Sequence, residues 1–98
     1  MAEVVQTEVF AKWLKALRDT LGRRAILRRL ARIVSTDHFG DHAGVGDGVS
    51  ELRVDVGPGY RVYYTVRDEC IVLLLCGGDK DSEERDIRRA KEMAAGLE

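Results

Sequence analysis

The chain has 98 residues, enough for one small domain (1–98) with a single hydrophobic core. Its 45% hydrophobic and 34% charged residues exclude a disordered protein, and a net charge of −1 indicates no general affinity for nucleic acid or membranes. No stretch reaches transmembrane length, and the first ten residues lack the apolar run of a signal peptide. We therefore expect a cytoplasmic protein with no membrane partner.

Two helices are expected in the first third of the chain. Residues 3–6 are predicted to form a short edge strand, and Thr7 can cap the helix that follows. The apolar residues of this helix have the three-four spacing of one buried stripe: Phe10, Trp13, Leu14 and Leu17. Gly22 is expected to break the pattern before a second helix over about 23–34. The short link between them predicts a helical hairpin packed on one face of a sheet.

The second helix carries a local excess of positive charge. Residues 21–35 contain five arginines and no acidic residue, a charge of +5. Like charges along one helix repel each other, and a bound polyanion would remove that repulsion. Arg24, Arg28 and Arg32 are therefore candidate contacts for a polyanion; the alternative is an ordinary solvated helix face.

A long loop is expected over 36–48, with four glycines and three aspartates. Loops of this length in compact domains are often functional or mobile. Phe39 is predicted to fix the loop to the core. His38, Asp41 and His42 have no fourth ligand nearby in the sequence, so we predict no metal site and no cofactor.

Three consecutive strands are predicted in the second half of the chain, and the rest of the chain is organised around them. Residues 49–56 and 60–67 alternate apolar and polar side chains, which is typical of a sheet buried on one face. Residues 70–76 are apolar throughout, apart from the strand's cysteines, and should be covered on both faces. Cys70 and Cys76 would lie roughly 20 Å apart on this strand, which excludes a disulfide between them.

The pairing of the first two strands follows from the rule that residues opposite each other in an antiparallel pair point to the same side of the sheet. If the valine side of both strands faces the core, Val56 lies opposite Tyr60, and 57–59 is a three-residue loop with Gly59 at positive φ. The same register predicts three pairs on the other face: Asp55 beside Arg61, Arg53 beside Tyr63, and Glu51 beside Thr65. This polar face is the candidate site.

A last helix is predicted after residue 80. Asp81 and Glu84 have the spacing of a capping box, and the helix has an apolar stripe of its own: Ile87, Ala90, Ala94 and Leu97. The predicted order is β-α-α-β-β-β-α. This is an α+β fold: a small antiparallel sheet with the helical hairpin on one face and the C-terminal helix near the open face.

The order of elements, with GPGYRVY over 57–63 and GGDK over 77–80, resembles the addiction-module killer proteins, a HigB-like branch of the RelE/ParE toxin superfamily. The resemblance covers nearly the whole chain. It implies a type II toxin, most often a ribosome-dependent mRNA endonuclease that inhibits translation, with a cognate helix-turn-helix antitoxin as partner. The related ParE branch shares the fold but inhibits DNA gyrase without catalysis, and a homologue that only binds its antitoxin is a third hypothesis.

RNA cleavage of this kind needs no metal. A base removes the proton of a ribose 2′-hydroxyl, the oxygen attacks the adjacent phosphate, and an acid protonates the leaving 5′ oxygen. The candidate residues are Arg53 and Arg61 as stabilisers of phosphate charge, Glu51 as base, Lys80 as acid or phosphate ligand, and Tyr63 as a stacking surface for an RNA base.

Ordinary structural roles are the alternative for these residues. Asp55 and Arg61 can be a simple cross-strand ion pair, and Tyr63 can be a packing partner. The chain also departs from the family pattern at two places. Glu83 stands where this branch is expected to have glutamine, and no histidine–tyrosine acid–base set follows it. The oligomeric state stays open.

Overall fold

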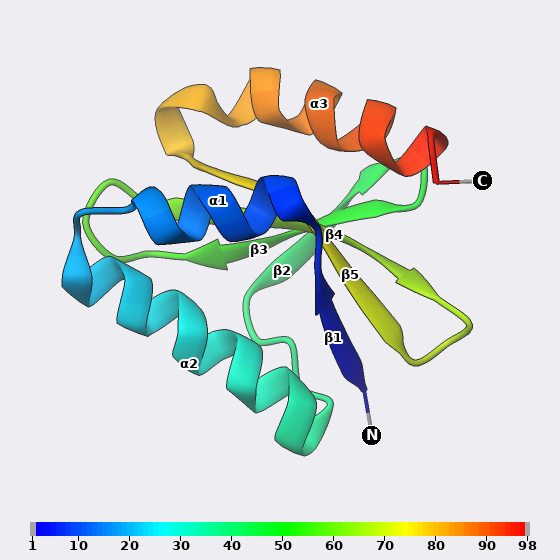
Figure 1. Cartoon of the computed structure of the whole chain (residues 1–98), viewed down its shortest axis with the longest axis horizontal. Helices are drawn as coiled ribbons and strands as arrows, with labels where there is room; N and C mark the ends of the chain where they lie inside the picture. Colours follow the sequence, from blue (N-terminus) through cyan, green and yellow to red (C-terminus); the bar gives the residue numbers. More distant parts are fainter. Residues whose placement is uncertain (1, 98) are drawn as a thin grey trace.

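The computed structural model describes residues 2–97 and confirms the predicted α+β class (Figure 1). Its elements in chain order are β1 (Glu3–Gln6), α1 (Glu8–Ala16), α2 (Thr20–Thr36), β2 (His42–Gly46), β3 (Val49–Val54), β4 (Tyr60–Arg67), β5 (Ile71–Asp79), a short 3-10 turn (Lys80–Ser82) and α3 (Glu83–Ala95). No helix within this described part is long and apolar enough to cross a lipid bilayer.

The five strands form one sheet in the order β1-β5-β4-β3-β2. Strand β1 runs parallel to β5, and the other neighbours are antiparallel, so the sheet is mixed rather than purely antiparallel as predicted. Strand β2 lies inside the segment predicted to be a loop. Its sequence, HAGVG, has little strand propensity, and it forms a strand by pairing with the edge of β3.

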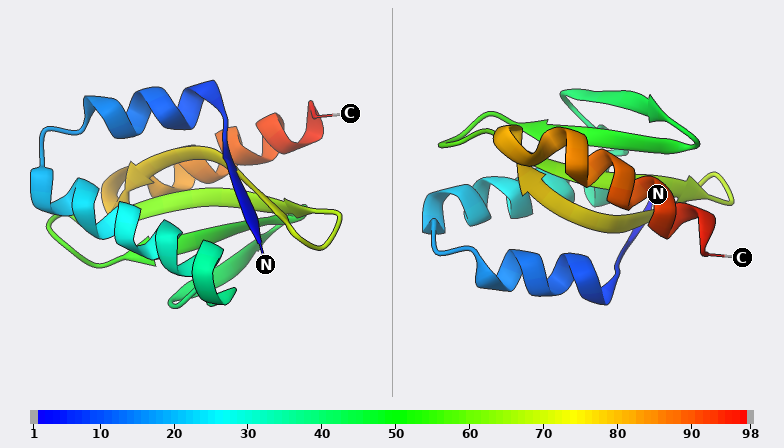
Figure 2. Two further views of the ribbon diagram at one scale, coloured as in Figure 1. Left: turned by 60° about the horizontal axis from the view of Figure 1, so that its bottom comes forward. Right: turned by 90° about the horizontal axis from the view of Figure 1, so that it is seen from above.

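The helices cover both faces of the sheet (Figures 1 and 2). Helices α1 and α2 pack on the face that carries the valine side of β3 and β4, as predicted, around this core: Phe10, Leu14, Ile26, Leu30, Ile33, Leu52, Val54, Tyr60, Val62, Tyr64, Val72 and Leu74. Helix α3 packs on the opposite face over a second, smaller core: Val49, Tyr63, Leu75, Cys76, Ala90 and Ala94. The face predicted to be open is therefore partly covered.

The helix starts follow ordinary capping chemistry. The Thr7 hydroxyl accepts a hydrogen bond from the Phe10 amide at 3.1 Å, as expected. Asp19 caps α2 by accepting from the Gly22 amide at 3.0 Å, so Gly22 lies in the first turn of α2 and does not break the helix. A Cβ at Gly22 would collide with the Tyr60 ring, which explains the glycine there by close packing rather than by chain reversal.

The hairpin between β3 and β4 differs from the prediction by two residues. Val54, not Val56, lies opposite Tyr60, so the loop has five residues, 55–59. Because the shift is even, the same side chains still face the core. Gly59 has φ of 80°, as predicted. The polar pairs change, however: Arg53 lies opposite Arg61, and Glu51 lies opposite Tyr63.

The GGDK segment has a packing role at the end of β5. A Cβ at Gly77 would overlap the Trp13 ring, and one at Gly78 would overlap the Asp86 carboxylate. The predicted capping box at Asp81 and Glu84 is wrong. The box is instead formed two residues earlier, where the Asp79 carboxylate accepts from the Ser82 amide at 3.2 Å and the Ser82 hydroxyl accepts from the Asp79 amide at 3.3 Å.

Substituting Gly77→Ala should destabilise the protein by about 2 kcal/mol, because the added methyl has to displace Trp13 from its place over β5. Urea unfolding followed by tryptophan fluorescence measures the loss. Gly44→Ala is the matched control, since a Cβ on this glycine of β2 meets nothing within 4 Å. The control should change stability by less than about 0.5 kcal/mol. Equal effects of the two substitutions would contradict the packing explanation.

Asp19 should make stability depend on pH. Hydrogen bonds from the Gly22 amide and the Tyr60 hydroxyl lower the pKa of Asp19 below its ordinary 3.8. A carboxyl whose pKa is lowered by folding stabilises the fold above the unfolded pKa and loses this contribution as pH falls through the folded pKa. Asp19→Asn retains a capping oxygen but not the charge. The difference in melting temperature between wild type and this variant should therefore shrink as pH falls below 3.8. A difference in melting temperature that does not change with pH would contradict this role of the Asp19 charge.

Candidate functional site

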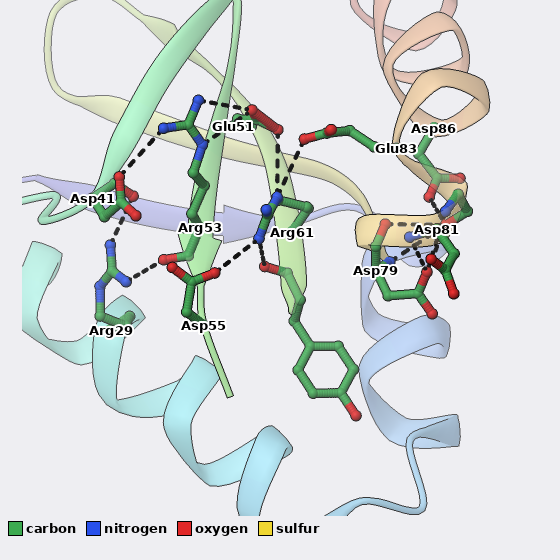
Figure 3. A network of polar contacts seen from close by, with 12 residues as sticks. Arg29, Asp41, Glu51, Arg53, Asp55, Arg61, Asp79, Asp81, Glu83 and Asp86 are labelled. Carbon is green, nitrogen blue, oxygen red and sulfur yellow. Dashed lines mark hydrogen bonds and ion pairs between the residues drawn. The ribbon is translucent and has the colours of Figure 1, made fainter. Parts of the chain in front are cut away.

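A polar cluster lies on the α3 face of the sheet, where β3, β4 and the start of α3 meet (Figure 3). Arg53 and Arg61 are direct cross-strand partners. Both guanidinium groups reach the same Glu51 carboxylate, since Arg53 Nη2 lies 3.3 Å from Oε1 and Arg61 Nε lies 3.8 Å from Oε2. The two arginines therefore converge on one point rather than pointing apart.

Arg61 is the buried centre of the cluster, with a side chain only 8% exposed. Its Nε donates to Glu83 Oε2 at 3.2 Å, and its Nη1 donates to Asp55 Oδ1 at 3.4 Å and to the Tyr60 carbonyl at 3.2 Å. The expected ion pair between Asp55 and Arg61 is thus present, although Asp55 makes it from the loop. Nη2 has no partner among residues 2–97, which leaves one donor edge of the guanidinium unoccupied.

Arg53 is the accessible arginine. Its side chain is 37% exposed and pairs with Asp41 at 3.5 Å as well as with Glu51. Its backbone is fixed by α2, because the Arg29 guanidinium donates to the Arg53 carbonyl at 2.5 Å and to the Asp41 carbonyl at 3.1 Å. Arg29 of α2 therefore holds β3, the strand that carries Arg53, in place.

The pKa values of Glu51 and Glu83 shift in opposite directions. Burial, followed by the neighbouring Glu83 carboxylate, raises the pKa of Glu51 above its ordinary 4.5. A hydrogen bond with Glu51, followed by the contact with Arg61, lowers the pKa of Glu83. Glu51 is 5% exposed at its side chain, whereas Glu83 is 34% exposed. The carboxylate that a substrate can reach is therefore Glu83.

Tyr63 does not have the predicted exposure. It is fully buried beneath α3, so its ring is not available for stacking on an RNA base. Its hydroxyl has no hydrogen-bond partner within residues 2–97, and burial, followed by the charge of Glu51, raises its pKa. The prediction of an exposed tyrosine was wrong because α3 covers this part of the sheet.

Lys80 lies at the rim of the cluster. It is exposed and follows β5 directly, in the 3-10 turn that leads to α3. A Cβ at Gly59 would lie 3.6 Å from Lys80 Cβ and 3.7 Å from Arg61 Nη1, so the lysine and the buried arginine flank the same turn. Lys80 can therefore place its ammonium at the mouth of the cluster.

The α2 arginines divide into two groups. Arg24, Arg28 and Arg32 are exposed along the surface of α2, as the candidate RNA contacts must be. Arg23 and Arg29 are half-buried and bonded to backbone carbonyls of Leu17 and Phe39, at 3.2 Å and 2.6 Å. Three of the five positive charges are therefore free to meet a polyanion, and whether they do so stays a prediction.

The balance of charge limits what the cluster can do. Two guanidinium groups contact four carboxylates: Asp41, Asp55, Glu51 and Glu83. An entering phosphate that takes Nη1 of Arg61 as well as the unoccupied Nη2 has to replace Asp55, whose side chain is 72% exposed. Within residues 2–97, no three His, Cys, Asp or Glu side chains are grouped to hold a metal ion.

Sequence reasoning missed two members of the cluster. Glu83 is 22 residues from Arg61 in the chain, and Asp41 is 12 residues from Arg53. Glu83 did stand out as a departure from an expected glutamine, but no pattern placed it against β4. Asp41 had been considered only as a metal ligand, because β2 was not expected.

Comparison with solved structures defines the fold. A free-state mutant of the Escherichia coli toxin RelE, with two arginines replaced by alanine, matches 94% of this chain and 98% of its own with a TM-score of 0.72 and 19% identity. A chain of the intact E. coli RelBE toxin–antitoxin complex matches with a TM-score of 0.65 and 20% identity over 81% of this chain and 96% of its own. E. coli YafQ follows with a TM-score of 0.61 and 12% identity, over 85% of this chain and 98% of its own. The chain has a RelE-like fold.

Sequence comparison defines the family. The profile of the phage-derived Gp49-like proteins (DUF891) matches residues 12–95, and the chain belongs to this family. An uncharacterized protein of Haemophilus influenzae (strain KW20 / Rd) is 40% identical over 95 residues, which is 97% of this chain and 95% of that protein.

Removing Arg61 should destabilise the fold by about 3 kcal/mol, because Glu51 and Glu83 are left without their shared cation. Arg61→Met tests this by urea unfolding. Arg53→Met is the comparison, because Arg53 donates to the same buried Glu51 but is itself 37% exposed, and we expect a smaller loss of about 1 kcal/mol. Without the cation the carboxyl pKa values rise in the folded state. The deficit should therefore be largest at neutral pH and shrink as pH falls through these raised pKa values towards the ordinary 4.5. Equal losses in the two variants would contradict it.

Proposed function

We propose that this protein is the toxin of a type II toxin–antitoxin system and that it cleaves mRNA in the ribosomal A site. The observation that carries this proposal is the convergence of Arg53 and Arg61, from adjacent strands, on one carboxylate beside Glu83 and Lys80. Support for the toxin role comes from the RelE-like fold, since the similar structures are toxins by name. The HigB-like branch and the nuclease activity are part of the proposal.

The proposed chemistry uses side chains alone. Arg53 approaches a phosphate of the RNA first, because it is the exposed arginine. The phosphate then displaces Asp55 and takes its place against Arg61, where a planar guanidinium can stabilise the charge that accumulates during attack. The carboxylates of Glu51 and Glu83 supply the base, and Lys80 at the rim supplies a proton to the leaving oxygen.

The proposed partners follow from the same interpretation. The RelBE structure is a toxin–antitoxin complex, so we propose a cognate antitoxin for this chain, of the helix-turn-helix type that the sequence resemblance implies. The exposed arginines of α2 would meet ribosomal RNA in the active state or an acidic antitoxin segment in the inhibited state: Arg24, Arg28 and Arg32.

A second candidate function is a homologue that binds an antitoxin and has no nuclease activity. The observation that favours it is that carboxylates already hold both arginines of the cluster. If a phosphate cannot displace them, the site is only a structural ion-pair network.

Arg53→Gln should lower mRNA cleavage by about 100-fold, because one donor to the transition-state charge is removed from an exposed position. Arg61→Lys should have a similar effect, since lysine retains the charge but loses the planar fork. Purified protein is incubated with translating ribosomes, and cuts are mapped by primer extension. Arg18→Gln, at an exposed arginine between α1 and α2, is the control.

Growth after induced expression separates the hypotheses. Arrest with mapped cuts supports the nuclease. Arrest without cuts, together with loss of supercoiling by gyrase in a parallel assay, would replace it with a gyrase inhibitor. Normal growth together with antitoxin binding would establish the inactive homologue.

A further inference from the structure

We propose that Glu51 and Glu83 share one proton, carried by Glu51, and that Glu83 is the carboxylate presented to substrate. The two side chains come from β3 and from the first turn of α3 and converge on a single atom, Arg61 Nε. Glu83 Oε2 lies 3.2 Å from that nitrogen, and Glu51 Oε2 lies 3.8 Å from it. Figure 3 shows the two carboxylates pointing toward one another beside the guanidinium.

One carboxylate oxygen of the pair has no hydrogen-bond donor within the described part of the chain. Arg61 Nε has a single hydrogen, which it donates to Glu83. Glu51 Oε1 accepts from Arg53, but Glu51 Oε2 is buried with no donor among residues 2–97. A buried carboxylate oxygen without a donor is unfavourable, and so are two adjacent like charges. A proton on Glu51 Oε2 removes both penalties, because it neutralises one charge and donates to Glu83.

The surrounding charges favour a bound proton. The ionisable groups around the pair are Arg53 from β3 and Arg61 from β4, which contact it, Asp41 and Asp55 from the flanking loops, which contact these arginines, and Tyr63 from β4, whose pKa is raised by burial and by the charges of both glutamates. Cys76 from β5 and Asp86 from α3 raise the pKa of Tyr63 as well. Burial keeps two of these neutral, raising the pKa of Tyr63 and bringing that of Cys76 to about 11. The two arginines contact four carboxylates, Glu51 and Glu83 among them, and one proton reduces the excess of negative charge.

The ionisation of the two groups agrees with this geometry. Burial and Glu83 raise the pKa of Glu51, whereas the hydrogen bond with Glu51 and the contact with Arg61 lower the pKa of Glu83. When the pKa values of two interacting carboxyl groups move apart, the group with the higher pKa carries the proton. The group with the lower pKa stays ionised and can act as a base.

The catalytic role of the pair rests on the proposed function. The base assigned to Glu51 from the sequence moves to Glu83, because Glu83 is 34% exposed and Glu51 only 5%. Glu83 takes the proton of the ribose 2′-hydroxyl while the O2′–P bond forms. The P–O5′ bond breaks, and the 5′ oxygen leaves as a hydroxyl with a proton from the Lys80 ammonium, which gives a 2′,3′-cyclic phosphate. Glu51 is a positioning residue that holds Glu83 in place and ionised.

The shared proton is tested without any activity. Carboxyl carbon shifts of the free, ¹³C-labelled protein are followed through a pH titration. We expect coupled transitions, one above and one below the ordinary 4.5. Glu83→Gln should lower the pKa of Glu51, because it removes the neighbouring charge. Asp55→Asn is the control: it changes a carboxylate on Arg61 that contacts neither glutamate and should leave the coupling intact. The proposal would be overturned if the two carboxyl groups titrate independently and Glu83→Gln leaves the pKa of Glu51 unchanged.

The assignment of Glu83 is tested by the pH dependence of RNA cleavage. Glu83→Gln should lower kcat/KM by about 100-fold above the acid limb of the profile, where Glu83 is ionised, since the amide cannot act as a base. Glu51→Leu removes the donor to Glu83 and should move the acid limb of the profile to higher pH, and Glu51→Gln should restore the limb because its amide can donate. Wild-type activity in Glu83→Gln would overturn the assignment. A wild-type protein that cleaves no RNA would refute the proposed function, and the titration would still decide whether the proton is shared.

Discussion

The buried guanidinium of Arg61 is the constraint on which this structure depends. A positive charge that is 8% exposed is stable only with anionic partners and satisfied donors. Those partners come from three places: Glu51 on β3, Asp55 in the hairpin loop and Glu83 at the start of α3. One side chain therefore joins the hairpin to the C-terminal helix and fixes where α3 crosses the sheet.

The same contacts make the cluster a compromise between folding and function. In the proposed function a phosphate replaces one of the carboxylates on Arg61, whereas Arg53 is already exposed. The proposed function therefore gives the arginines different roles: Arg61 holds the site together, and Arg53 meets the ligand. It also explains why an alanine at position 61 is a poor test of catalysis, since loss of the fold and loss of chemistry would appear together.

Much of the fold could be predicted because local patterns determine it. The alternation of β3 and β4 assigned the core face correctly even though the hairpin register was wrong by two residues, because an even shift preserves the side. Thr7 and the stripe of α1 were visible in the sequence. Gly22 and β2 were misjudged because their structure depends on distant partners: Gly22 fits under Tyr60, and β2 needs the edge of β3.

By itself, the sequence determined the α+β class, the face of each strand and the grouping of Arg53, Arg61 and Glu51 on one side of the sheet, because side-chain period and strand adjacency are local properties. Only the tertiary structure decided which of these residues is accessible. Helix α3 crosses that side, buries Tyr63 and brings Glu83 to Arg61 across 22 residues of chain. Burial and ion pairing arise from the packing of separate elements, and no spacing within one element can encode them.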